Sequence, residues 1–277
     1  MLGHTDNTMR NFEAHSAPIG VYDSGIGGLS VLRALRELMP GASFIYVADN
    51  AHAPYGDRSP EFIESRARQI TGFLVQRGAR AVVLACNTAS VVAAQQLRRL
   101  HLLPIVAMEP AIKPAAQITK SKVVLVLATT NTIQSQSVAR LCRAYGKDVK
   151  VILQPCPGLA DQVERGQFQG GSTKRLLEKF ILPGIAAGAD TIVLGCTHYA
   201  FLAEEISLIA GSSVTVIEPS GAIARQLARV LPETPAPRKT AAATTYYTSG
   251  SAPDMHAFLT SIGEPSEPVH VLPAGAA

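Results

Sequence analysis

One short segment occurs twice in the chain, and this repeat constrains the fold more than any other feature. Residues 78–88 read GARAVVLACNT, and residues 188–198 read GADTIVLGCTH. In both copies a glycine precedes an apolar run, which ends on a cysteine followed by polar residues. Such a run is typical of a buried parallel strand whose carboxyl end meets the start of a helix. The repeat therefore predicts two equivalent strands with Cys86 and Cys196 at their carboxyl ends.

Strand-like and helical segments alternate along the rest of the chain, which indicates βαβ units and parallel sheets. The expected strands are 19–22, 44–47, 81–85, 105–107, 123–127, 149–153, 191–195 and 214–217. The expected helices are 29–38, 60–77, 89–100, 133–145, 171–185 and 201–210. The cysteine strand is third in each set of four strands, so we predict an α/β fold with two similar, duplicated halves. After a loop at 235–243 we expect one more strand at 245–248, a helix at 253–261 and an irregular tail from residue 263.

Length and composition narrow the class of protein. A chain of 277 residues has room for about two domains of roughly 140 residues each. The net charge of +4 is modest and the basic residues are scattered, so no nucleic-acid partner is expected. The N-terminal residues lack the pattern of a secretory signal, and no apolar stretch reaches 18 residues. We therefore expect a cytoplasmic protein with no membrane partner.

The cysteines allow several interpretations. In a cytosolic protein the four cysteines should be reduced thiols, and Cys196 with His198 offers too few ligands for zinc, so no metal is expected. A cysteine hydrolase built on Cys196 and His198 would leave Cys86 without a role. A thiol beside a helix N-terminus should have its pKa lowered from about 8.5 toward neutrality. Two such thiols favour a catalytic role, whereas a structural role is expected for Cys142 and Cys156.

Polar residues follow other strands as well, where ligands of parallel sheets bind. The segment DSGIGG at 23–28 lacks the third glycine of a dinucleotide fingerprint and the Gly-Lys of a P-loop. A tight turn capped by Asp23 or Ser24 is the simpler interpretation. In the loop 52–58, Tyr55 has two possible roles, packing on the core or contacting a ligand, and Arg58 is expected at the surface.

Taken together, these motifs resemble those of the glutamate racemases, in the cofactor-independent Asp/Glu racemase superfamily. The resemblance extends from about residue 19 to residue 220. It rests on VYDSGIGGL at 21–29, YVAD at 46–49, PYG at 54–56, ACNTA at 85–89, EP at 109–110, CP at 156–157 and LGCTHY at 194–199.

The resemblance implies two doubly wound parallel-sheet domains that face each other across a central cleft. The first domain would comprise 18–110 and 221–262, and the second 111–220. Residues 1–17 would be a disordered extension and 263–277 an irregular tail. No cofactor is implied, because two thiols on opposite faces of one carbon suffice to remove and return its proton.

The resemblance also implies the site residues. Cys86 and Cys196 would be the acid/base thiols, Asp23 would support Cys86, and His198 with Glu164 would support Cys196. The sequence after Cys156-Pro157 departs from the family pattern, so the position of Glu164 is the least fixed. The implied substrate contacts are Asp23, Ser24, Tyr55, Gly56, Asn87, Thr88, Thr197 and His198.

The implied activity is interconversion of L- and D-glutamate, which supplies D-glutamate for peptidoglycan synthesis. Aspartate or hydantoin racemisation is an alternative within the same superfamily, and a catalytically idle regulatory binder is an alternative from another class. Glutamate is the expected partner. The sequence leaves open a homodimer and activation by a cell-wall nucleotide precursor, which some relatives show.

Overall fold

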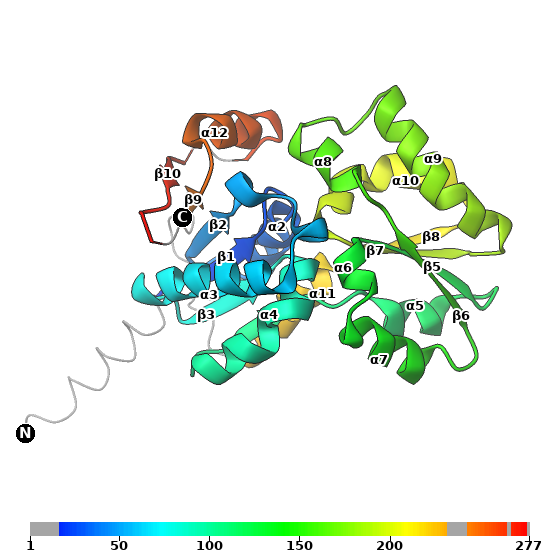
Figure 1. Cartoon of the computed structure of the whole chain (residues 1–277), viewed down its shortest axis with the longest axis horizontal. Helices are drawn as coiled ribbons and strands as arrows, with labels where there is room; N and C mark the ends of the chain where they lie inside the picture. The colour runs from blue at the N-terminus through cyan, green and yellow to red at the C-terminus, as the bar shows by residue number, and fades with distance from the viewer. Residues whose placement is uncertain (1–16, 232–242, 265–266, 276–277) are drawn as a thin grey trace, which may run out of the picture.

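A computed structural model describes residues 17–231, 243–264 and 267–275, which form two parallel β-sheets flanked by helices (Figure 1). Among these residues, six strands make the first sheet, in the order β10-β9-β2-β1-β3-β4, and four make the second, in the order β6-β5-β7-β8. The α/β class with two parallel-sheet domains is thus confirmed. The first sheet contains β1 (Ile19–Asp23), β2 (Phe44–Ala48), β3 (Ala81–Leu84), β4 (Ile105–Ala107), β9 (Thr244–Thr248) and β10 (Val269–Val271). The second contains β5 (Val123–Ala128), β6 (Lys150–Pro155), β7 (Thr191–Gly195) and β8 (Thr215–Ile217).

The two sheets share one strand order. In the first, β2-β1-β3-β4 are neighbours, and in the second β6-β5-β7-β8 repeat the same arrangement. The cysteine strands β3 and β7 therefore occupy equivalent positions, each next to the first strand of its own half. The chain then returns to the first sheet, where β9 pairs with β2 in parallel.

Helices cover both faces of each sheet, because the strands are apolar on both sides. In the first half, α2 (Leu29–Leu38) and α11 (Ser220–Val230) cover one face, and α3 (Pro60–Gln76) and α4 (Asn87–Leu100) the other. In the second half, α9 (Gly171–Ala186) and α10 (Ala203–Ala210) lie opposite α5 (Ile112–Ile118) and α7 (Gln136–Tyr145).

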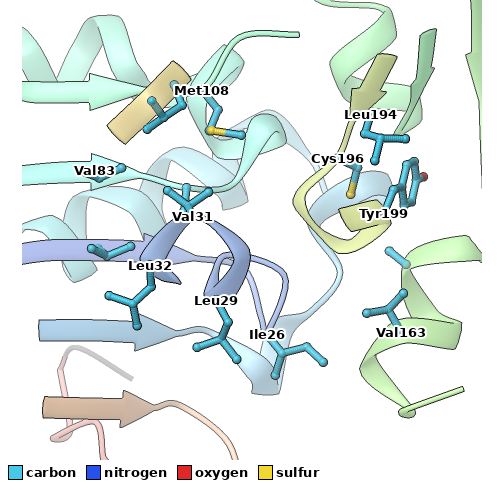
Figure 2. Packing of buried hydrophobic residues seen from close by; sticks show 14 of the residues in the cluster. Ile26, Leu29, Val31, Leu32, Val83, Met108, Val163, Leu194, Cys196 and Tyr199 are labelled. Atoms are coloured by element: carbon cyan, nitrogen blue, oxygen red, sulfur yellow. The ribbon is translucent and has the colours of Figure 1, made fainter. Parts of the chain in front are cut away.

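One apolar cluster runs through both halves of the molecule. It contains Leu29 and Leu32 of α2 in the first half and Leu194 and Tyr199 in the second, and Figure 2 shows these side chains. The halves are therefore packed against each other through buried apolar surface, rather than joined only by their connecting chain.

The structure differs from the expected elements in several places. The helix expected at 133–145 begins later, at Gln136 of α7, because the Ser135 hydroxyl accepts a hydrogen bond from Val138 N (3.2 Å) and caps the helix there. The short helix α6 (Thr130–Ile133) precedes it and was not expected. The helix expected at 201–210 begins later, after the 3₁₀ helix η3 (Thr197–Leu202). The short helix α8 (Leu159–Glu164) was not expected.

The tail expected to be irregular from residue 263 contains β10, which pairs with β9. An edge strand of three residues leaves too weak a pattern to be found in a Pro-rich sequence. Except for residue 17, the expected N-terminal extension lies outside the described residues, as do residues 235–242 of the expected loop. The domain boundaries at 110 and 220 stay predictions. In the described part of the chain, none of the helices has the length and apolar character needed to cross a membrane.

Candidate active site

The carboxyl ends of the two sheets meet, and polar side chains connect them. Asp23 ends β1, and its Oδ2 accepts a hydrogen bond from Thr197 Oγ1 (2.9 Å), just after β7. Thr88, at the start of α4, lies with its Oγ1 2.9 Å from Oγ1 of Thr129, which follows β5. The strand ends that the sequence singled out therefore form one site.

The structure places the predicted site residues together and buries nearly all of them. Only Glu164 is partly exposed, with 17% of its side chain accessible. The halves are in contact, so the expected cleft is closed. The buried residues are Asp23, Ser24, Tyr55, Gly56, Cys86, Asn87, Thr88, Cys196, Thr197 and His198.

Cys86 lies at the N-terminus of α4 and serves as its cap. Its Sγ accepts a hydrogen bond from Ala89 N (3.4 Å) and donates one to Ser24 Oγ (3.5 Å). The lowered pKa expected for this thiol is wrong for the closed protein. Burial and the nearby Asp23 carboxylate outweigh the donors Ser24 and Ala89 and raise the pKa of Cys86 to about 12. Cys86 is therefore a neutral thiol in the closed site.

Cys196 has a different set of partners (Figure 2 shows it where β7 ends, beside Tyr199). Its Sγ lies 3.7 Å from Nδ1 of His198, whose Nε2 lies 2.6 Å from Oε1 of Glu164. Burial opposes a charge on the imidazole, but the hydrogen bonds to Cys196 and Glu164 outweigh it and raise the pKa of His198. The structure thus places Glu164, the least fixed residue of the prediction, directly behind His198.

Asp23 connects the surroundings of the two thiols. Its Oδ1 accepts hydrogen bonds from Gly25 N (2.9 Å) and Ser24 Oγ (3.5 Å), while its Oδ2 is held by Thr197. Burial raises the pKa of this carboxyl, although His198 and the hydrogen bonds of Gly25 and Thr197 act against it. Asp23 also faces Cys86 closely enough to affect its titration.

The glycines of the segment 23–28 allow the two halves to approach closely. A Cβ on Gly27 would lie 2.6 Å from His198 Nδ1 and 2.6 Å from Thr197 Oγ1. A Cβ on Gly25 would overlap the Glu164 carboxylate. Glycine at these two positions therefore allows the second half to approach closely. The turn is tight, as predicted, but neither Asp23 nor Ser24 caps α2: its N-cap is Gly28, without a side-chain hydrogen bond, and Asp23 Oδ1 accepts from Gly25 N within the turn.

Asn87 is the most unusual buried group of the site. Both its Oδ1 and its Nδ2 are buried and lack a hydrogen-bond partner among the described residues, although only 1% of the residue is exposed. An unpaired buried amide costs about 1–3 kcal/mol. An unpaired amide next to Cys86 and Thr88 is expected where a bound ligand supplies the hydrogen bonds.

The Tyr55 hydroxyl belongs to a buried network. It accepts a hydrogen bond from Tyr22 OH (2.8 Å) and donates one to Asp49 Oδ2 (2.5 Å), and Asp49 in turn binds Arg66 through both oxygens (2.7 and 2.9 Å). The hydroxyl is thus occupied within the protein. This network fixes the short 3₁₀ helix η2 (Tyr55–Asp57), which also carries the buried Gly56.

Some polar residues of the site were not among those predicted from the sequence. The hydroxyls of Thr129 and Thr132 lie within 3.4 Å of Thr88 Oγ1, and Asn50 Nδ2 donates to Glu164 Oε2 (3.1 Å). Thr129 follows a predicted strand, so the rule that ligands bind beyond strand ends could have found it. Asn50 likewise follows the predicted strand 44–47, so the same rule applies to it.

The other two cysteines lie outside this set of contacts or at its margin. Cys142 is a partly exposed residue of α7, whereas Cys156 is buried and donates from Sγ to its neighbour Gln154 O (3.4 Å). Burial, followed by the proximity of Cys196, raises the pKa of Cys156. A structural role stays the prediction for both.

The chain is similar in sequence to a known family of enzymes. The Asp/Glu/Hydantoin racemase family model matches residues 29–227. A glutamate racemase of Ectopseudomonas mendocina is 48% identical over 257 residues, covering 92% of this chain and 98% of that protein.

Solved structures of glutamate racemases have the same fold. That from Bacillus anthracis superposes with a TM-score of 0.84 at 28% identity, covering 94% of this chain and 99% of that one. That from Escherichia coli, in complex with L-glutamate and the activator UDP-MurNAc-ala, has a TM-score of 0.82 at 30% identity, covering 92% and 98%. The resemblance found in the motifs is confirmed: the chain belongs to the Asp/Glu/hydantoin racemase family, and its enzyme class is that of a racemase.

Proposed function

We propose that this chain interconverts L- and D-glutamate by a two-base mechanism in which Cys86 and Cys196 exchange protons with the α-carbon. The observation that carries the proposal is the pair of buried thiols at equivalent strand ends, each with its own polar partners and near enough for Cys196 to affect the pKa of Cys86. The product D-glutamate would supply peptidoglycan synthesis. The names of the similar proteins support glutamate as the substrate.

The reaction needs no oxidant or reductant. One cysteine, as thiolate, takes the α-proton, so that the Cα–H bond breaks and an S–H bond forms. The other cysteine, as thiol, gives its proton to the opposite face of the carbanion, which forms the new Cα–H bond. Turnover in the reverse direction exchanges the two roles, as general acid–base catalysis requires.

The polar groups of the site suit a substrate with two carboxylates and an ammonium group. Asn87 and Thr88 would donate hydrogen bonds to carboxylate oxygens, most strongly as the carbanion develops in a dry site. Ser24 and Thr197 donate to Asp23 in the closed protein, so they would join these donors once their hydroxyls turn toward the substrate. The substrate's ammonium group would favour the thiolate form of a nearby cysteine, because an opposite charge lowers the pKa of a thiol. Binding would thus counteract the burial that keeps Cys86 neutral.

Tyr55 and Gly56 would contribute through the backbone. The Tyr55 hydroxyl already has two partners, so we infer that any substrate contact of this loop comes from main-chain groups of η2. Asp23 would act on Cys86, and His198 with Glu164 on Cys196.

Deuterium exchange tests the reaction, the substrate and the bases together. In D₂O, wild-type protein should introduce deuterium at the α-carbon of glutamate while inverting it. Cys86→Ser and Cys196→Ser should each lower racemisation at least about a hundredfold, the usual contribution of a general acid or base. Cys142→Ser is the matched control and should keep the wild-type rate. Full racemisation by Cys196→Ser would sink the two-thiol mechanism.

The alternatives predict different results in simple assays. Chiral chromatography of a panel of amino acids and hydantoins would separate glutamate racemisation from that of aspartate or hydantoins. A protein that binds glutamate but exchanges no α-proton would be the idle binder. Because the E. coli enzyme has UDP-MurNAc-ala as activator, the rate should also be compared with and without that compound. A homodimer and a cytoplasmic location stay expectations.

A further inference from the structure

A chain of hydrogen bonds leads from the first sheet to the thiol of the second half. Thr248, at the end of β9, donates from Oγ1 to Asn50 Oδ1 (3.0 Å), and Asn50 Nδ2 donates to Glu164 Oε2 (3.1 Å). Glu164 Oε1 is hydrogen-bonded to His198 Nε2, and His198 Nδ1 contacts the Cys196 Sγ. The chain crosses from β9 and η1 (Asn50–His52) to α8 and η3 (Figure 1 shows the strands and α8).

The two hydrogen bonds of the Asn50 amide have a defined direction. The Glu164 carboxylate has only acceptors, so the Asn50 amide must turn its NH₂ group toward it. That orientation turns Asn50 Oδ1 toward Thr248, whose hydroxyl donates to it and accepts from Gly250 N (3.0 Å). Thr248 therefore fixes which end of the Asn50 amide faces the carboxylate.

Glu164 needs such support because of where it lies. It is the last residue of the short helix α8, and its side chain is partly exposed. Glu164 and Asn50 both line a cavity that also includes Asp254 of α12 (Ala252–Ser261). Solvent there can compete for the carboxylate. Two donors from the first half hold it in place: Ile26 N on Oε1 (2.9 Å) and Asn50 on Oε2.

We propose that Asn50 and Thr248 are positioning residues for the racemisation, acting through Glu164 to orient His198 against Cys196. This inference rests on the proposed function. The polypeptide returns to the first sheet as β9, and this return would have a role in the chemistry, because β9 supplies Thr248, the outermost residue of the hydrogen-bond series. Cys86 has separate partners in Ser24 and Ala89 N, so the support is specific to Cys196.

Two threonines on β9 offer a matched pair of substitutions. Thr248 and Thr244 are both buried, but the Thr244 hydroxyl has no hydrogen-bond partner among the described residues. Thr248→Val removes a member of the chain, and Thr244→Val makes the same change four residues away on the same strand. Asn50→Ala breaks the chain one step closer to Glu164.

Kinetics should distinguish these variants. We expect Asn50→Ala to lower kcat about tenfold, the lower end for loss of a hydrogen bond to a charged group. Thr248→Val should lower kcat about threefold, because it acts one step further away, and Thr244→Val should keep the wild-type value. KM should change less than kcat, because no substrate contact is lost.

Proton NMR gives a readout that a merely structural role would not move. The short hydrogen bond between His198 and Glu164 should produce a far-downfield proton resonance, identified by its loss in His198→Asn. Asn50→Ala and Thr248→Val should shift or broaden this resonance, and Thr244→Val should leave it in place. An unchanged resonance in both chain variants, or equal kcat losses in the two threonine variants, would overturn the proposal.

The same experiment separates this inference from the proposed function. If the wild-type protein does not racemise glutamate, the proposed function fails, while the histidine resonance still reports whether Asn50 and Thr248 orient His198. If the wild type racemises glutamate and the resonance is the same in Asn50→Ala and Thr248→Val as in wild type, only the positioning role fails.

Discussion

At the scale of single residues, the first turns of α4 carry one polar side chain that is fully paired and one that is not. On α4, Ser90 uses its hydroxyl twice, donating to Leu84 O (3.0 Å) and accepting from Met108 N (2.9 Å). Asn87, less than one turn earlier, has both polar side-chain atoms buried, and neither has a partner in the described part of the chain. The paired hydroxyl of Ser90 stabilises the folded chain. The unpaired amide of Asn87 destabilises it, and a ligand that forms hydrogen bonds with the amide can remove this unfavourable free energy.

Substitution of these two neighbours should therefore have opposite consequences. Asn87→Ala should leave the free energy of unfolding within about 1 kcal/mol of wild type, because no hydrogen bond is lost and an unsatisfied amide is removed. It should raise KM for glutamate about tenfold or more, since a hydrogen bond to a charged group is lost. Ser90→Ala should instead cost about 1–3 kcal/mol of stability and change KM little. Urea unfolding and initial rates measure both, and a wild-type KM for Asn87→Ala would contradict this role.

At the scale of elements, the duplicated strand and helix carry two different thiol environments. In the first copy the Cys86 thiol caps the α-helix α4. In the second copy Cys196 precedes the 3₁₀ helix η3, and its thiol contacts His198. The apolar run fixes the strand and the position of the cysteine, which is why the repeat could be found in the sequence. The residues after the cysteine differ, and they decide its partners.

Contacts that cross between distant segments are the part that could not be predicted. Asn50 and Thr248 touch because β9 pairs with β2, a long-range pairing without a local signal in either segment. The raised pKa of Cys86 was missed for a related reason. A helix N-terminus is visible in the sequence, but the extent of burial and the approach of Asp23 depend on the closed arrangement of both halves.

The segment 49–58 is an element whose stability should depend on acid. Burial opposes the charge on Asp49, but Arg66 and Tyr55 outweigh it and lower the pKa of Asp49 from 3.8 to about 2. A lowered folded-state pKa stabilises the protein above the unfolded value, and that stability is lost as pH falls through the folded value. Asp49 should thus contribute about 2 kcal/mol above pH 4 that disappears toward pH 2.

Asp49→Asn provides the corresponding measurement. Urea unfolding near neutral pH should show a loss of about 2 kcal/mol, and the difference from wild type should shrink steadily between pH 4 and pH 2. Asp57→Asn, which changes an exposed carboxylate of the same loop, is the control and should give little difference at either pH. A difference between Asp49→Asn and wild type that does not vary with pH would show that the carboxylate's charge is not what stabilises the loop.

At the scale of the whole molecule, the buried site requires the two halves to move apart before a ligand can enter. The closed arrangement is held by hydrogen bonds across the strand ends and by a cluster of three rings. Phe168 and Phe201 of the second half stack at 5.6 Å between ring centroids, and Phe258 of α12 packs edge-on against them at 6.0 and 6.1 Å. Because α12 belongs to the returning segment, this cluster joins the C-terminal part of the chain to the second half.

The ring cluster should control closure more than it controls folding. Phe258→Leu removes two aromatic pairs across the halves, each worth about 0.5–1.5 kcal/mol. We expect the closed state to lose population, which should raise KM for glutamate about tenfold and speed hydrogen exchange at the Ile26 amide, which donates to Glu164. Phe73→Leu is the matched control, because Phe73 packs at 4.9 Å against Tyr247 within the first sheet's own core. It should lower the melting temperature with KM nearly unchanged. If Phe258→Leu and Phe73→Leu changed KM and Ile26 exchange equally, the cluster would be a stabilising contact without a part in closure.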